Sequence, residues 1–225
     1  MAEVEDPATP LVVMVEDSPD ARLFIELSSH AADLTEADHA LELALQEHDP
    51  GSSLADARPY LVGFAVVAYG RSVLHSNVRG RLTDHVNVPD HFADVHEQIK
   101  DFRNATIAHS QSELSVTYPM GFLDPNTLEV SHVAAVTMGS TLPIAVTQRF
   151  RKLVEAMIDQ LDQAIEPIRA RLEDGLRQTN PDALLAGARP TVLTRAADDF
   201  EPRSKRTSYP TRQTLYWDQN AISAE

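Results

Sequence analysis

The amino-acid sequence predicts an all-α protein of four to five helices, with an inserted β-hairpin and an extended C-terminal tail. Three observations predict it. Apolar residues recur three and four positions apart over most of 20–178, which is the period of an amphipathic helix. β-Branched residues and a turn signal replace that period between about 112 and 141, which favours a hairpin. After residue 179 the period fades and prolines recur.

These patterns divide the chain into three parts. Residues 1–19 form an acidic arm, 20–178 form the helical domain with its hairpin insertion, and 179–225 form a tail that is extended or disordered. At the first boundary, Asp17 or Ser18 can cap a helix whose first turn tolerates Pro19.

The helices follow from the spacing of apolar residues. The first helix ends before the breaker at 49–51, and the second runs over about 53–76. The second contains an apolar run from Tyr60 to Tyr69 that predicts a central position; the run alone also suits a strand, but its length and alanines favour helix. A third helix starts near Asp90, and a fourth spans about 143–178 with a kink at Pro167.

Composition limits the function classes. The net charge of -15 argues against a protein that binds nucleic acid non-specifically over its surface, because phosphate contacts need cations. A small local basic site is still compatible with this charge. Without cysteine the chain has no disulfide and no thiolate metal site, which fits a reducing cytoplasm. The acidic N-terminus is unlike a signal peptide, and no apolar run is long enough for a membrane helix. We expect a cytoplasmic protein without a membrane partner.

We expect no metal and no cofactor. His85, His91 and His96 lie near aspartates, but their spacing does not match a zinc motif. The chain also has no glycine loop of the phosphate-cradling type. The opening run from Leu11 to Arg22 resembles that of a receiver domain, yet no second strand with a phosphorylatable aspartate follows, so we reject that interpretation.

The segment from Ile99 to Ser110 carries the side chains best suited to chemistry. Arg103 and Asn104 fall near the end of an amphipathic helix, where a guanidinium suits oxyanion binding. His109 can act as a general acid or base near neutral pH. Ideal helix separates Arg103 from His109 by about 9 Å of rise and puts them on different sides, unless the last turn unwinds. Two chains around a twofold axis could bring two such sets together.

Arg103-Asn104 followed by His109 resembles the signature of HEPN domains in residue type, spacing and helix position. The resemblance covers about 54–175 as an architecture and is specific over 99–110. It implies a dimeric HEPN-like helical bundle that cuts RNA without a metal. His109 would move protons, Arg103 would stabilise charge on the phosphate, and Asn104 would orient either group.

The resemblance also implies partners: an RNA substrate, a second copy of the chain, and a cognate antitoxin or nucleotidyltransferase in a toxin–antitoxin or phage-defence system. Arg71, Arg79 and Arg81 are candidates for holding RNA phosphates, although surface arginines in so acidic a chain more often pair with carboxylates.

A second interpretation keeps the HEPN-like bundle but makes it a non-catalytic interaction or sensor module. Catalysis predicts that His109 is exposed in a cleft beside Arg103. A scaffold predicts that His109 is buried and that Arg103 pairs with a local carboxylate. In that second case the helix dipole alone explains a histidine near a helix C-terminus.

Overall fold

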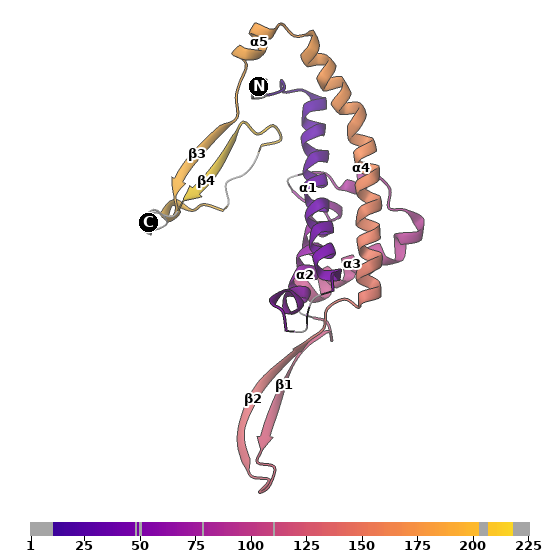
Figure 1. The fold of residues 1–225 in the computed structure, drawn as a ribbon, viewed down its shortest axis with the longest axis vertical. Helices are drawn as coiled ribbons and strands as arrows, with labels where there is room; N and C mark the ends of the chain where they lie inside the picture. The colour runs from indigo at the N-terminus through magenta and orange to yellow at the C-terminus, as the bar shows by residue number, and fades with distance from the viewer. Residues whose placement is uncertain are drawn as a thin grey trace, which may run out of the picture. The chain divides into compact units, whose positions relative to one another are not determined.

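The structure is a computed structural model that describes residues 11–47, 49, 51–77, 79–109, 111–202 and 207–217. The first ten residues of the expected acidic arm, and residues 203–206 and 218–225 of the expected tail, lie outside the described residues. The described part is mostly helical, as predicted, with two small two-stranded sheets (Figure 1). The chain divides into two compact units: unit 1 is Met1–Glu26 with Ile165–Glu225, and unit 2 is Leu27–Ala164.

Two of the four long helices begin at serine caps. Their bounds are Pro19–Leu45 for α1, Ser53–Val73 for α2, Ala93–Phe102 for α3 and Ile144–Gln178 for α4. Ser18 Oγ accepts a hydrogen bond from the Ala21 amide at 3.1 Å, and Ser52 Oγ accepts one from the Ala55 amide at 3.2 Å. Each hydroxyl satisfies an amide that has no partner within the first turn. Pro167 lies inside α4, which continues beyond it.

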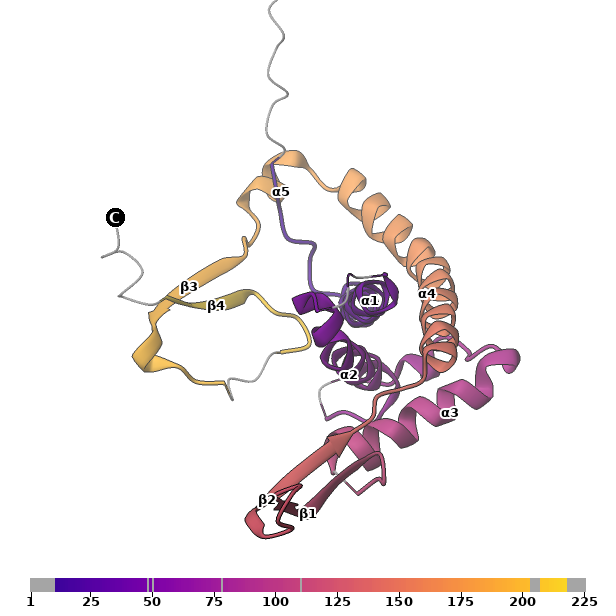
Figure 2. The same cartoon turned by 60° about the horizontal axis from the view of Figure 1, so that its bottom comes forward.

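The core of unit 2 lies where α1, α2, α3 and the first part of α4 meet (Figure 2). Each helix contributes fully buried side chains at helical spacing: Leu34 and Leu41, Val62 and Val66, Val95 and Ile99, and Phe150, Leu153, Met157 and Leu161. Tyr69 of α2 meets Phe150 of α4 edge to face, with ring centroids 5.3 Å apart. At the surface, Arg151 of α4 donates to Asp38 of α1 at 2.9 Å.

The hairpin is present where the sequence predicts one. Strands β1 (Ser115–Leu123) and β2 (Val130–Gly139) pair antiparallel, with a bulge between Phe122 and Leu123. The turn follows from Asp124, whose side chain accepts hydrogen bonds from the amides of Asn126 at 2.8 Å and Thr127 at 2.9 Å. An aspartate that bonds the backbone two and three residues ahead stabilises such a turn.

The C-terminal segment of unit 1 holds more regular structure than the extended or disordered tail that the sequence predicts. It contains the short helix α5 (Pro181–Ala186) and a parallel pair of strands, β3 (Thr191–Ala196) and β4 (Arg212–Trp217). Asn180 caps α5 by accepting from the Asp182 amide at 2.8 Å, and Pro181 occupies the first turn. The prolines therefore mark starts and connections between short elements here, and not disorder.

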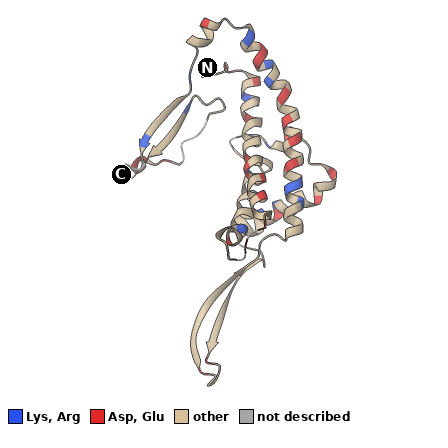
Figure 3. Ribbon diagram, in the orientation of Figure 1, with Lys and Arg blue, Asp and Glu red and all other residues tan. Residues whose placement is uncertain are grey.

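Charge is distributed unevenly among the elements. Figure 3 shows acidic residues along α1 and α4, whereas the strands of the β1–β2 hairpin carry no Lys, Arg, Asp or Glu. In the described part of the chain, no helix is both long enough and apolar enough to cross a membrane.

Candidate functional site

Arg103 and Asn104 begin a π-helix that continues α3. The π-helix spans Arg103–Ala108, and Phe102 just before it is buried, which anchors the end of α3 in the core. Arg103 is half-buried and Asn104 is exposed. An Arg103 Nη1 group donates to the Asn104 side-chain oxygen at 3.0 Å, so the two predicted site residues lie together.

The π winding changes the geometry expected for this segment. A π-helix joins residues five apart by hydrogen bonds, where an α-helix joins residues four apart. The π-helix ends at Ala108, and His109 follows it as the C-cap residue with a different backbone conformation. The π-helix packs against α2 at two glycines of α2. Side-chain atoms of Ile107 lie near Gly63, and side-chain atoms of Arg103 lie near Gly70. π-Helical turns of this kind are frequent at functional sites.

Arg103 opens onto a small pocket that we call the arginine pocket. It has a volume of about 300 Å³ and is lined by Val67, Gly70, Arg71, Leu74, His75, Ser76, Arg79 and Arg103. The end of α2, the connector after it and the π-helix thus bring together three of the four arginines that the sequence singles out. Arg81 is not one of the lining residues; it is exposed and pairs with Asp84 at 2.9 Å.

Carboxylates of α1 neutralise two of these three arginines. Asp33 accepts ion pairs from Arg79 and, at 2.8 Å, from Arg71, and Glu36 pairs with Arg71 at 2.5 Å. Asp33 and Arg79 side chains are each 12% exposed, so this pair is partly shielded from water. Among the described residues, Arg103 makes no ion pair with a carboxylate. It is the cation of the arginine pocket that remains available to an anion.

His109 is exposed at the end of the π-helix and does not line the arginine pocket. The catalytic interpretation predicts an exposed His109, and the scaffold interpretation predicts an Arg103 paired with a carboxylate. The structure agrees with the catalytic interpretation on both features. The convergence of both groups on one cleft, which the catalytic interpretation also requires, is not present in the single chain. The structure therefore brings together Arg103, Asn104, Arg71 and Arg79, and leaves His109 outside this group.

A buried polar pair that the sequence did not reveal lies between α2 and α3. The Tyr69 hydroxyl and His96 Nδ1 are 2.6 Å apart, and His96 Nε2 lies 3.6 Å from a Glu97 carboxylate oxygen. Burial, and secondarily the Glu97 charge, raises the pKa of Tyr69 above its usual range. Burial, followed by the nearby Lys100, lowers the pKa of His96. The lowered pKa of His96 favours the neutral imidazole, whose Nδ1 accepts from Tyr69 when Nε2, on the side of Glu97, carries the proton.

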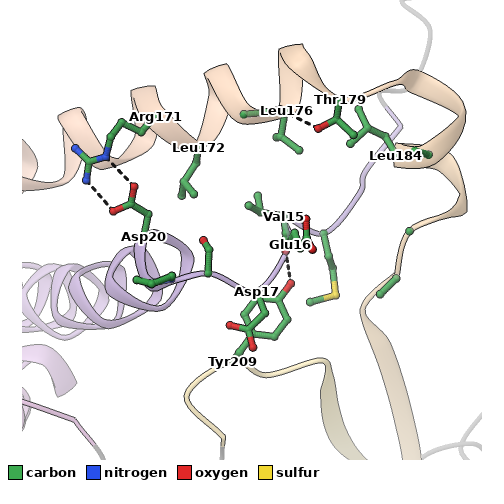
Figure 4. Close-up of a pocket in the computed structure, with 17 residues that line it drawn as sticks. Val15, Glu16, Asp17, Asp20, Arg171, Leu172, Leu176, Thr179, Leu184 and Tyr209 are labelled. Carbon is green, nitrogen blue, oxygen red and sulfur yellow. Dashed lines mark hydrogen bonds and ion pairs between the residues drawn. The ribbon is translucent and has the colours of Figure 1, made fainter.

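Unit 1 contains a larger pocket of about 830 Å³ between the segment before α1, the end of α4, α5 and Tyr209 (Figure 4). Aliphatic side chains such as Leu172, Leu176 and Leu184 line much of it. Among the carboxylates in its lining, Asp20 is bound by Arg171 at 2.7 and 2.8 Å. The Tyr209 hydroxyl donates to the Val15 carbonyl. The aliphatic part of this lining suits binding of an apolar group.

No family model matches the chain, and no curated protein or solved structure is significantly similar to it.

Proposed function

We propose that this protein is a metal-independent endoribonuclease of the HEPN type. It binds an RNA phosphate at Arg103 and cleaves the RNA with the help of His109. The observation that carries the proposal is the unpaired state of Arg103 among the described residues, inside a pocket shared with Arg71 and Arg79. A half-buried guanidinium without a carboxylate is a ready site for a phosphate oxygen.

The charge of the arginine pocket supports a single phosphate better than an extended RNA surface. Three arginines face two carboxylates, Asp33 and Glu36, so one positive charge remains. Arg71 and Arg79 then act mainly by holding the pocket in shape, and Arg103 makes the contact. The acidic chain as a whole repels an anionic substrate, so recognition of RNA would depend on this one site.

The proposed reaction is internal transesterification. The ribose 2′-oxygen forms a bond to phosphorus and the bond to the 5′-oxygen breaks, which gives a 2′,3′-cyclic phosphate and a free 5′-hydroxyl. His109 takes the 2′-hydroxyl proton or gives a proton to the leaving 5′-oxygen, and Arg103 stabilises the charge that builds on phosphorus-bound oxygens. Asn104, held by Arg103, orients the phosphate or His109.

A second copy would complete the site, because one chain leaves His109 outside the arginine pocket. We place the activity in the cytoplasm and propose that it belongs to a toxin–antitoxin or phage-defence system. A cognate antitoxin or nucleotidyltransferase would then control it.

The alternative function is a non-catalytic HEPN-like interaction or sensor module. The pairing of Arg71 and Arg79 with Asp33 favours it, because those ion pairs fix α1 against α2 whether or not a ligand binds. In that case the arginine pocket is a structural junction between α1 and the end of α2.

Cleavage of cellular RNA in EDTA distinguishes the two functions. We expect the wild type to cleave and both His109→Ala and Arg103→Gln to lose cleavage with their folds intact. His39→Ala and Arg177→Gln are matched controls, since both side chains are mostly exposed, on α1 and α4 respectively. No cleavage by the wild type, or equal cleavage by the His109→Ala variant, would refute the catalytic assignment.

A further inference from the structure

A row of exposed apolar side chains runs along α2 and ends at the arginine pocket. Tyr60, Phe64 and Val67 are four and three residues apart, so they lie on one side of the helix. Tyr60 is 79% exposed, Phe64 46% and Val67 37%. Val67 also lines the arginine pocket, as does Arg71, which lies one turn further along the same side. We call Tyr60, Phe64 and Val67 the α2 stripe.

The π-helix lies beside the α2 stripe and runs in the opposite direction to α2. Arg103 lies near Gly70 in the last turn of α2, whereas Ile107 lies near Gly63, about two turns earlier. Ile107 is itself exposed and therefore widens the apolar surface next to the stripe. The α2 stripe and the arginine pocket, with Arg103 in its lining, thus belong to one continuous surface that α2 and the π-helix form together.

The chemistry of this surface fits an unpaired nucleobase next to a phosphate. Every base has a flat π-face, so an exposed aromatic ring can stack on it whatever the sequence. Tyr60 and Phe64 supply two such rings, and Arg103 supplies the cation for the phosphate. A stacked base needs no cation. Stacking would therefore add affinity that a chain with a net charge of -15 cannot gain from many phosphate contacts.

The spacing of the two rings favours a single strand over a duplex. Residues four apart on an α-helix are separated by a rise of about 6 Å, whereas bases stacked within one strand are about 3.4 Å apart. Bases that rest on Tyr60 and Phe64 would thus be too far apart to stay stacked on each other. A duplex keeps its bases paired and stacked inside, so only unpaired bases can reach both rings. Asp56, exposed one turn before Tyr60, would repel a further phosphate and limits the stripe to one base for each ring.

We propose that the α2 stripe is a base-stacking subsite, in which Tyr60 and Phe64 hold unpaired bases of an RNA strand whose phosphate lies at Arg103. This inference rests on the proposed function, because the phosphate at Arg103 determines where the strand lies. It adds a selectivity that the arginine pocket lacks. A phosphate contact carries no information about base pairing, whereas stacking on exposed rings requires a base that is free of its partner.

Binding of a short single-stranded 2′-O-methyl RNA to the full chain tests the subsite without cleavage, because this RNA lacks the 2′-hydroxyl nucleophile. We expect Tyr60→Ala and Phe64→Ala each to weaken binding about 5- to 150-fold in fluorescence anisotropy. Tyr60→Phe keeps a ring and should recover most of the loss seen with Tyr60→Ala. A 2′-O-methyl duplex of the same length should bind the wild type more weakly.

Leu54→Ala is the matched control for the alanine variants. Leu54 lies on α2 with 45% of its surface exposed, but it is about a third of a turn around the helix from Tyr60. Its loss removes exposed apolar area from the same helix without touching the α2 stripe, so binding of the single strand should not change. Far-UV circular dichroism shows whether each variant keeps its helices.

Salt dependence separates stacking from phosphate contact. For a single strand, the logarithm of the binding constant falls against the logarithm of salt concentration with a slope of about -0.7 for each phosphate that a cation neutralises. Arg103→Gln should make that slope shallower by about 0.7. Tyr60→Ala and Phe64→Ala should weaken binding and leave the slope as it is in the wild type, because a stacked base releases no counterion.

Several results would overturn the subsite. They are a wild type that does not bind the single strand, alanine variants that bind as tightly as the wild type, equal binding of single strand and duplex, and a Tyr60→Phe variant as weak as Tyr60→Ala. A dimer in sedimentation equilibrium that Phe64→Ala dissociates, with RNA binding unchanged, would assign the α2 stripe to a second copy of the chain instead.

The same variants separate this inference from the proposed function. Binding that needs both rings, in a wild type that cleaves no RNA, would leave the subsite standing and remove the ribonuclease assignment alone. Cleavage of unmodified RNA that proceeds equally in the wild type, Tyr60→Ala and Phe64→Ala would keep the ribonuclease and remove the subsite.

Discussion

The Tyr69→Phe substitution isolates one hydrogen bond at the centre of unit 2. Tyr69 is fully buried, and its hydroxyl lies 2.6 Å from His96 Nδ1. Phenylalanine keeps the ring and its edge-to-face contact with Phe150, so packing changes little. What changes is that a buried imidazole nitrogen loses its donor, which costs about 1–3 kcal/mol in the free energy of unfolding. For a chain of this length that corresponds to a Tm lower by about 2–12 °C.

Urea denaturation followed by far-UV circular dichroism measures this loss. The matched control is Tyr60→Phe, because Tyr60 lies on the same helix with 79% of its surface exposed and should change the free energy of unfolding by under about 0.5 kcal/mol. If Tyr69→Phe unfolds at the same urea concentration as Tyr60→Phe, the Tyr69–His96 hydrogen bond does not contribute as argued.

Three further stability predictions follow from the same packing. Burial lowers the pKa of His96 in the folded chain, so on acidification His96 is protonated in the unfolded chain first. The free energy of unfolding should therefore fall as pH drops below the ordinary histidine pKa of 6.5. The His96→Gln variant should lack that part of the pH dependence in denaturation curves. Ser52→Ala should cost about 0.5–2 kcal/mol by removing the cap of α2, measured against the exposed neighbour Ser53→Ala. Asp33→Ala should destabilise by about 1–3 kcal/mol, since it strips a partly buried Arg79 of its anion. Glu36→Ala is the control for Asp33→Ala, and both are measured by thermal denaturation. Because the Glu36 side chain is 51% exposed, its loss should lower the free energy of unfolding by under about 1 kcal/mol.

The long elements could be predicted because their signals are local. The caps at Ser18 and Ser52, and the turn at Asp124, each act through side chains within three residues of the amides they satisfy. Amphipathic spacing over 35 residues likewise defines α4 closely. Strands β3 and β4 escaped prediction because each is six residues long and their pairing joins segments about 20 residues apart, such as Thr191 with Arg212.

The composition of the candidate site could not be predicted from local sequence signals alone. The sequence singled out Arg71, Arg79 and Arg103 by residue type, but only packing of α1, α2 and the π-helix determines that Asp33 neutralises the first two and leaves Arg103. Arg81 stands two residues from Arg79, yet its partner is the neighbouring Asp84. Tyr69 and His96 were missed as a pair because they are 27 residues apart and each resembles an ordinary core residue.

The division of the chain into units also sets an order for folding during synthesis. Unit 2 is one continuous stretch, Leu27–Ala164, whereas unit 1 joins residues before Leu27 to residues after Ala164. A ribosome adds about 5–20 residues per second, so the N-terminal part of unit 1 waits several seconds after the last residue of unit 2 is made. During that interval the segment before α1 lacks Tyr209, whose hydroxyl donates to the Val15 carbonyl in the complete chain. Unit 2 therefore has the opportunity to fold first, and the two ends of the chain close unit 1 afterwards.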